Sequence, residues 1–330
     1  MLSNIRKRII LIIFDLWFSY YIWTVNASWG NTFQTCLNLS ISTFLVVFIP
    51  FEIYWRFRDI WSDRWKKIPT EKLKGISKVE VAIKVEGGYI SADIIKPMDR
   101  VKMEKRNTII IVSPGFSDIK ESIQYYYYPF IFQGYIVIVY DARGTGESKK
   151  AGRRSQFLKR IDDFKNILEW IKEDEFLKHM KLNCVGFSIG AITVLCGGFR
   201  NKNINKIIAI SSMSKYRQNL PKYNFIVMFS YFIKGVKLFP NDQENKKLSP
   251  YVEFERLKKE LSDNEWKWFS ERVMLIHSKN DRVIKFKNLN ENKSILETLP
   301  ENLLILKKGG HSHKKNELAL VGASLNFFNN

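Results

Sequence analysis

A chain of 330 residues is long enough for one large α/β domain plus an appendage, and its 45% hydrophobic and 26% charged residues are typical of a folded protein rather than a disordered one. The net charge of +20 favours an anionic partner, either nucleic acid or an anionic membrane surface. Because the lysines are dispersed and no nucleic-acid motif is present, we expect no nucleic-acid partner. Cys36, Cys184 and Cys196 have no metal or redox spacing, which argues against a disulfide framework and a metal site.

Residues 1–75 contain two apolar stretches with basic residues on their outer flanks. Ile9 to Val25 follows Arg6-Lys7-Arg8, and the second stretch runs from about Thr32 to Trp55 before a further group of arginines and lysines. Both approach or exceed the length of a membrane span. Because the connection at residues 26–31 is uncharged, the positive-inside rule predicts a membrane-associated helical hairpin with both ends in the cytoplasm.

Two alternatives stay open for these residues. A cleaved signal peptide lacks a small-residue cleavage pattern here and leaves the second stretch unexplained. A soluble pair of helices packed on the rest of the chain is favoured by the polar Asp15, Gln34 and Asn38. Tryptophan favours the level of the lipid headgroups, and this region is rich in it: Trp17, Trp23, Trp29, Trp55, Trp61 and Trp65. We therefore expect a membrane protein whose larger domain lies on the cytoplasmic side.

Strand-like and helical patterns alternate over residues 76–330. The strand-like runs are Lys78 to Glu86, Tyr89 to Lys96, Thr108 to Ser113, Tyr135 to Tyr140, Leu182 to Phe187, Lys206 to Ser211, Val273 to His277 and Leu303 to Leu306. The helical patterns are Ser122 to Gln133, Gln156 to Phe176, Ile189 to Arg200, Lys285 to Leu299 and Lys314 to Phe328. Gly87-Gly88 predicts a hairpin at an antiparallel edge, and the continuous apolarity of the later runs suits strands buried on both faces. The pattern predicts a doubly wound, mostly parallel, eight-stranded sheet.

The segment at about 213–270 interrupts this alternation, because it is far longer than an ordinary connection between two strands. We refer to it as the cap segment and expect a helical insertion. Its aromatic residues, in the run Phe225 to Ile233 and at Trp266, Trp268 and Phe269, form either the core of the cap itself or a wall that binds an acyl group.

The sequence Gly186-Phe187-Ser188-Ile189-Gly190 lies between a buried strand and a helix. A G-x-S-x-G sequence in this context forms a sharp turn that exposes the serine hydroxyl at the carboxyl edge of the sheet. Small residues at 186 and 190 let the strand and the helix approach closely. Ser188 is therefore the predicted nucleophile.

This turn and the run Gly134 to Ser148 together resemble the α/β-hydrolase superfamily, and more loosely its serine aminopeptidase, monoacylglycerol lipase and acyl-esterase branches. The resemblance extends from Lys78 to the C-terminus and implies an α/β-hydrolase fold with a helical cap for residues 76–330. Within it, Asp141 to Ser148 is similar to the family's D-x-R-G-x-G-x-S loop. That loop is structural in the family, so we assign neither Asp141 nor Arg143 a catalytic role.

The fold places an acid and then a histidine after the nucleophile. Ser278 to Ile284 resembles the family's G-x-x-D-x-x-V loop, which makes Asp281 the predicted acid, with a turn or helix-capping role as the alternative. His311 matches the loop after the last strand and is the predicted base, with His313 as the alternative. His179 and His277 are less well placed.

Two backbone N–H groups, those of Phe116 and Ile189, are the predicted oxyanion hole. Ser113-Pro114-Gly115-Phe116 occupies the place of the family's His-Gly motif, with Ser and Pro ahead of the glycine. Because the donors are backbone groups, this departure bears on substrate preference rather than on the oxyanion hole.

The sequence thus predicts a serine hydrolase that cleaves a carboxylic ester, lipid-like or small, through an acyl-enzyme and without a metal or organic cofactor. Two alternatives stay open: a serine peptidase resembling aminopeptidases, and a non-catalytic, membrane-anchored binding module with this fold. The oligomeric state is not predicted.

Overall fold

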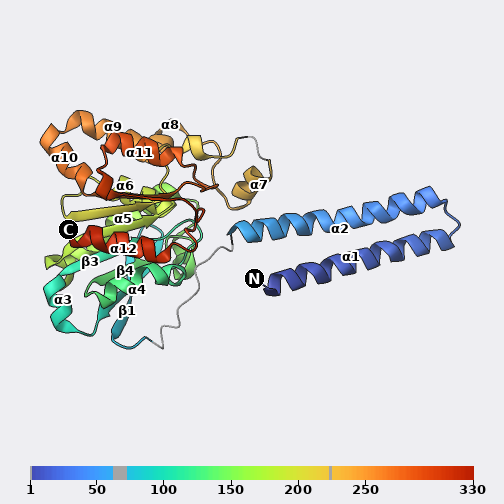
Figure 1. Ribbon diagram of the computed structural model, residues 1–330, viewed down its shortest axis with the longest axis horizontal. Coiled ribbons are helices and arrows are strands. Elements are labelled where there is room, and N and C mark those ends of the chain that lie inside the picture. Colours follow the sequence, from blue (N-terminus) through green and yellow to red (C-terminus); the bar gives the residue numbers. More distant parts are fainter. Residues whose placement is uncertain (1, 62–72, 223–224) are drawn as a thin grey trace. The chain divides into compact units, whose positions relative to one another are not determined.

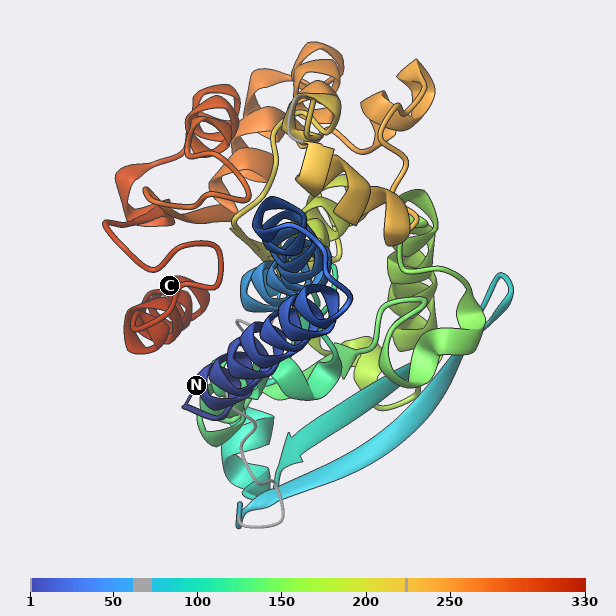
Figure 2. The same cartoon turned by 90° about the vertical axis from the view of Figure 1, so that its right-hand side faces the viewer.

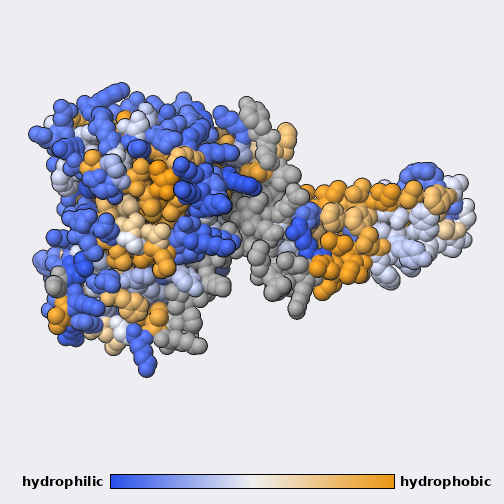
Figure 3. Space-filling model, in the orientation of Figure 1, coloured by the Kyte–Doolittle hydropathy of each residue, from blue (hydrophilic) through white to orange (hydrophobic). Residues whose placement is uncertain are grey.

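The computed structural model describes residues 2–61, 73–222 and 225–330, and the chain divides into two compact units at about residue 63. The first unit is a hairpin of two long helices, α1 (Leu2–Ser28) and α2 (Phe33–Trp61), shown in blue in Figure 1. Within them, residues 8–28 and 33–55 are long and apolar enough to cross a membrane. Apolar side chains cover much of the visible side of this hairpin (Figure 3).

The second unit contains one eight-stranded sheet, in the order β1-β2-β4-β3-β5-β6-β7-β8. Its strands are β1 (Ile76–Val85), β2 (Gly88–Pro97), β3 (Thr108–Ser113), β4 (Ile136–Tyr140), β5 (Lys181–Phe187), β6 (Ile204–Ile210), β7 (Val273–Ser278) and β8 (Leu303–Leu306). β2 is antiparallel to both β1 and β4, and every other neighbouring pair is parallel. The β1–β2 hairpin, in cyan, curves along one edge (Figure 2). The predicted mostly parallel sheet with an antiparallel edge is confirmed.

Helices cover both faces of this sheet. They are α3 (Arg100–Arg106), α4 (Gln124–Phe132), α5 (Phe157–Glu173), α6 (Ile189–Gly198), α11 (Lys287–Leu296) and α12 (Glu317–Asn329), with short 3₁₀ turns η2 (Lys120–Ile123), η3 (Gly146–Ala151), η4 (Leu177–His179), η5 (Arg217–Asn219) and η6 (Pro300–Asn302). The sequence patterns did not predict α3. This helix is only seven residues long, too short to show a clear apolar period, and it begins with a hydrogen bond from the Lys102 N–H to the Asp99 side chain.

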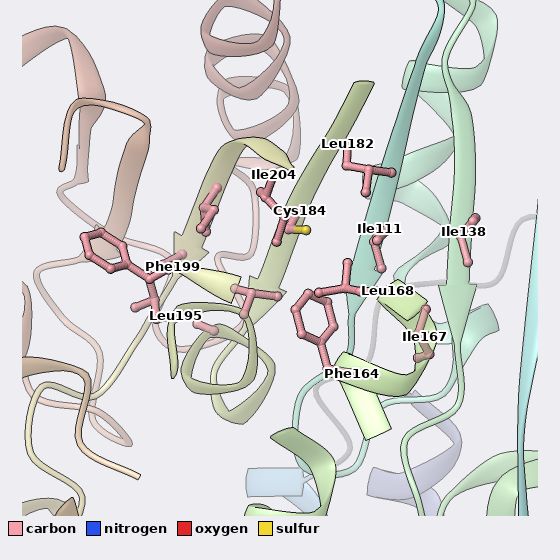
Figure 4. Packing of buried hydrophobic residues seen from close by; sticks show 14 of the residues in the cluster. Ile111, Ile138, Phe164, Ile167, Leu168, Leu182, Cys184, Leu195, Phe199 and Ile204 are labelled. Atoms are coloured by element: carbon pink, nitrogen blue, oxygen red, sulfur yellow. The ribbon is translucent and has the colours of Figure 1, made fainter. Parts of the chain in front are cut away.

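Alternate residues of each central strand contribute to two separate cores. In β3, Ile109 and Ile111 belong to the core beneath α5 and α6, whereas Ile110 and Val112 belong to the core beneath α4 and α12. Figure 4 shows the first of these cores, where α5 packs its apolar side chains on the strands. Both faces are therefore buried, which explains why the central strands are apolar without interruption.

The cap segment contains α7 (Phe225–Ile233), α8 (Asp242–Lys247), α9 (Pro250–Glu260) and α10 (Asp263–Glu271), between β6 and β7. The aromatic rings of Trp266 and Phe269 in α10 do not form a separate cap core. They pack on Phe199 after α6, with ring centroids 5.8 and 5.6 Å away, and belong to the main core. Trp268 is about half exposed and lies 4.5 Å from the Arg272 guanidinium. None of these three rings is therefore assigned to an acyl-binding wall.

Candidate active site

Ser188 lies at the sharp turn between β5 and α6, at the carboxyl edge of the sheet. Its backbone has φ 55° and ψ −113°, a conformation that L-residues adopt rarely and at a cost of about 1–3 kcal/mol. The Ser188 N–H donates to the Ile210 carbonyl at 2.8 Å, which ties the turn to β6. A Cβ at position 186 would lie 2.2 Å from the Gly190 carbonyl oxygen, and one at position 190 would lie 2.2 Å from the Ser113 carbonyl oxygen. Only glycine fits at these two positions.

His311 connects Ser188 to Asp281 through two hydrogen bonds. Its Nε2 is 3.0 Å from the Ser188 Oγ, and its Nδ1 is 2.8 Å from the Asp281 Oδ2. Asp281 follows β7 and His311 follows β8, so three strand ends supply the three side chains. Because a carboxylate only accepts hydrogen bonds, Nδ1 carries the proton, and the bare Nε2 is left to accept the Ser188 proton.

Asp281 is fully surrounded by donors. Its Oδ1 accepts from the Val283 and Ile284 amides at 2.8 and 2.9 Å, and its Oδ2 accepts from His311 and from the Ser211 hydroxyl at 3.0 Å. Burial alone would raise the pKa of this carboxyl, but the hydrogen bond and charge of His311 and the Ile284 amide lower the pKa of Asp281 to about 2. The carboxylate is therefore ionised at neutral pH.

The predicted oxyanion hole consists of the backbone amides of Ile189 and Phe116. The Ile189 amide opens α6, where the first N–H groups of a helix have no partner within the helix. The loop that carries Phe116 packs on the start of α6, as the close approach of Gly190 to Ser113 shows. The nearly buried guanidinium of Arg160 donates to the carbonyl oxygens of Gly115 and Phe116, at 3.2 and 3.3 Å. Although burial lowers the pKa of Arg160 to about 10, the group stays cationic at neutral pH and braces this loop.

The loop similar to D-x-R-G-x-G-x-S is held by buried polar contacts. Asp141 accepts from the Lys120 and Glu147 amides, both at 2.8 Å. Arg143 forms a two-pronged ion pair with Asp163, at 2.8 and 2.5 Å, in which each side chain is only 2% exposed. These contacts engage both side chains in holding the loop.

The other histidines have different surroundings. His179 is exposed in η4 before β5, at the end of that strand opposite to Ser188. His277 in β7 places its Nε2 2.9 Å from the Ile284 carbonyl oxygen and 3.6 Å from Asp281 Oδ2. His313, the alternative base, is 1% exposed and lies 3.1 Å from the Ser211 hydroxyl rather than against Ser188.

Sequence reasoning did not single out Ser211 or Arg160. Ser211 is the last residue of the strand-like run Lys206 to Ser211, and Arg160 falls within the helical pattern Gln156 to Phe176. The local pattern at each position is ordinary, so only the contact between distant segments reveals them. Among the residues that the structure describes, no cluster of three or more His, Cys, Asp or Glu side chains is arranged to hold a metal ion.

Comparisons with known proteins agree with this fold. The family model described as serine aminopeptidase, S33, matches residues 104–267. The structure is similar to an acylaminoacyl peptidase from Pyrococcus horikoshii (TM-score 0.56, 16% identity), to dipeptidyl peptidase 4 from Porphyromonas gingivalis (0.54, 18%) and to an esterase from Pyrococcus furiosus (0.53, 17%). A comparison with proteins of curated function gave no match.

These similarities cover 79, 78 and 80% of this chain, respectively. The chain spans only 42 and 36% of the two peptidases, but 93% of the esterase. At such low identity the solved structures establish the fold alone. The chain therefore has the α/β-hydrolase fold, and over residues 104–267 it is similar to the serine aminopeptidase family S33.

Proposed function

We propose that this chain is a membrane-attached esterase that cleaves carboxylic esters with a lipophilic acyl group through Ser188, His311 and Asp281. The observation that carries the proposal is the continuous hydrogen-bond chain from the Ser188 Oγ through His311 to a buried, ionised Asp281. A serine hydroxyl is a weak nucleophile at neutral pH, and this arrangement supplies the base that it needs.

In the proposed reaction, His311 Nε2 takes the Ser188 proton while Oγ attacks the ester carbonyl. The amides of Ile189 and Phe116 stabilise the oxyanion, and His311 then donates its proton to the departing alkoxide. Water, activated by the same histidine, attacks the acyl-enzyme and releases the acid. Asp281 holds the Nδ1–H tautomer throughout and stabilises the transient imidazolium.

The preference for a lipophilic acyl group is supported by the apolar surroundings of the proposed oxyanion hole. Ile189 belongs to a buried apolar cluster with residues of the cap segment, and Phe116 packs on its border. The cap members of this cluster are Met213, Tyr216, Leu220, Val236 and Leu248. An acyl chain that leaves Ser188 toward the cap segment would meet hydrocarbon.

Membrane attachment is supported by two separate features. The first is the α1–α2 hairpin, whose basic outer flanks favour a catalytic unit on the cytoplasmic side. The second is α7, which exposes four large apolar side chains in one helical stripe, with exposed fractions between 59 and 83%: Phe225, Phe229, Phe232 and Ile233.

Cleavage of aminoacyl amides is the second candidate activity. The specific observation in its favour is the family model, whose description names a serine aminopeptidase. An ester panel of increasing acyl length, run beside aminoacyl anilides, separates the two. Rates that rise with acyl length support the esterase, whereas faster cleavage of the anilides refutes it in favour of the peptidase.

Covalent labelling by a fluorophosphonate probe tests the nucleophile. We expect the intact chain to be labelled and Ser188→Ala not to be, with Ser155→Ala as the matched control at a serine outside the site. Equal labelling of the intact chain and Ser188→Ala would exclude Ser188. A protein that no active-site probe labels would instead be the non-catalytic binding module.

Alkaline-carbonate extraction and lipid presentation test the attachment. The full-length chain should stay in the membrane pellet, and its release into the supernatant would refute the anchor. We expect Phe229→Ser to slow hydrolysis of a bilayer-resident ester but not of a water-soluble one. The control Leu318→Ser, at another exposed position, should change neither rate.

A further inference from the structure

Three residues around Asp281 share a strained backbone. Ser188, Ser211 and His313 have φ values of 55°, 50° and 54°, in the left-handed region that non-glycine residues seldom occupy. Such strain persists only where the surrounding structure fixes the residue, and it is concentrated at functional sites. Ser188 is the proposed nucleophile. The strain at the other two residues calls for a separate reason.

Ser211 lies between Asp281 and His313. Its hydroxyl oxygen is 3.0 Å from the Asp281 Oδ2 and 3.1 Å from the His313 Nε2. Ser211 and His313 are each 1% exposed, and the Ser211 N–H is held by the Ile276 carbonyl at 2.8 Å. The positive φ follows directly after the last residue of β6 and turns this side chain toward the acid.

The direction of each hydrogen bond follows from the chemistry of the groups. A serine hydroxyl has one hydrogen, and the ionised Asp281 can only accept, so Ser211 donates to Asp281. The Ser211 oxygen must therefore accept from His313, which requires a proton on Nε2. Burial, with the charges of His311 and His277, lowers the pKa of His313 to about 3, so the ring is neutral and Nδ1 carries no proton. The His313 Nδ1 is a buried atom without a hydrogen-bond partner in the described structure, so no contact there requires the proton to be on Nδ1.

We propose that Ser211 and His313 are positioning residues, which act through a relay from His313 Nε2–H to Ser211 Oγ–H to Asp281 Oδ2 and hold the acid against His311. This inference rests on the proposed role of Asp281 and His311. Two backbone amides fix the Asp281 Oδ1. Among the residues that the structure describes, the Oδ2 accepts hydrogen bonds from Ser211 and from His311, whose side chain is 27% exposed, while the His277 Nε2 is farther away at 3.6 Å. Ser211 is thus the buried partner that keeps the Oδ2 directed at the His311 Nδ1 when His311 moves during the reaction.

Removal of the Ser211 hydroxyl has two expected effects. A carboxylate that loses one of its donors is held less firmly, so we expect Ser211→Ala to lower the rate of fluorophosphonate labelling about tenfold with unchanged reversible binding of the probe. Without the Ser211 hydrogen bond, the negative charge of Asp281 also stabilises the protonated form of His311 more strongly. The acid limb of the pH–rate profile should therefore move to higher pH. The titratable groups that share this site with His311 are Asp281, His277 and His313.

Two substitutions of His313 separate the hydrogen bond from packing. In His313→Gln, the amide nitrogen can take the place of Nε2 and still donate to Ser211, whereas His313→Phe keeps the ring volume without a donor. Both carry the same backbone strain. We expect His313→Phe to resemble Ser211→Ala and His313→Gln to be labelled at a rate nearer to that of the unmodified chain. The double variant Ser211→Ala/His313→Phe should be no slower than Ser211→Ala, because both changes break one relay.

The experiment measures the labelling rate constant of the full chain from pH 5 to 9, with thermal melting to confirm the fold. Three outcomes would each overturn the relay. They are an unchanged labelling rate in a folded Ser211→Ala, equal losses of rate in His313→Gln and His313→Phe, and a loss in the double variant equal to the product of the single losses. If Ser211→Ala does not fold, the comparison of His313→Gln with His313→Phe decides. Labelling that persists in Ser188→Ala refutes the proposed function instead, so the two failures are distinguishable.

Discussion

Gly190→Ala is a direct test of how closely the proposed oxyanion loop packs on the helix that follows Ser188. A Cβ at this position would lie 2.2 Å from the Ser113 carbonyl oxygen and 2.6 Å from that of Pro114. Both contacts are with backbone, and Ser113 is fixed further by its pairing with Gly186 and by a 2.7 Å hydrogen bond to the Tyr140 hydroxyl. To reach a tolerable separation, α6 and the loop must move apart by about 1 Å.

The magnitude of the effect follows from this displacement. Overpacking of this kind costs roughly 1–3 kcal/mol, which exceeds the gain of about 1 kcal/mol for replacing glycine by alanine in a helix. A displacement of about 1 Å between reacting groups can lower a rate by roughly 100-fold, because the Phe116 and Ile189 amides would no longer converge on one oxyanion. We therefore expect a lower melting temperature and labelling by a fluorophosphonate that is about 100-fold slower.

Gly322→Ala is the matched control, since Gly322 lies in α12 and an added Cβ there has no heavy atom within 4 Å. It should raise stability by at most about 1 kcal/mol and leave the labelling rate unchanged. If Gly190→Ala were labelled as fast as Gly322→Ala and melted at the same temperature, the proposed close packing between the Ser113–Phe116 loop and α6 would be refuted.

Two further predictions concern buried charge and pH. Arg143→Met leaves the Asp163 carboxylate buried without its paired guanidinium, and we expect the free energy of unfolding in urea to fall by about 3–5 kcal/mol. The control Lys172→Met removes an exposed ion pair and should lower it by at most about 0.5 kcal/mol. Similar losses in the two variants would contradict this account. Burial lowers the pKa of His313 in the folded chain to about 3, whereas its pKa in the unfolded chain is about 6.5. Below pH 6.5 the unfolded chain therefore binds a proton that the folded chain does not, and the free energy of unfolding decreases as the pH is lowered. Between pH 7 and 5 this amounts to about 2 kcal/mol, and unfolding curves of His313→Gln should lack that part of the loss; an unchanged pH dependence would show that His313 is protonated when folded.

Local pattern was sufficient for the architecture and for the nucleophile turn. The central strands are buried on both faces, so they are apolar without interruption and stand out against the amphipathic helices between them. The turn at Ser188 depends on glycines two residues away on either side, which a short window contains. The structure brings Ser188, Asp281 and His311 together in the predicted order, while their catalytic roles, the membrane anchor and its cytoplasmic orientation stay predictions.

What local pattern could not supply are contacts between residues far apart in the chain. From the sequence, Trp266 and Phe269 are expected in a cap core or in an acyl-binding wall. Their packing on Phe199 instead places them in the main core, because burial depends on partners that lie far away in the chain. Ser211 and His313 lie 102 residues apart, and neither carries a motif. The amino-acid sequence by itself determined which strand ends meet at one edge of the sheet. Only the tertiary structure decided which side chains face each other there, because hydrogen-bond partners are fixed by distances of about 3 Å that residue spacing does not encode.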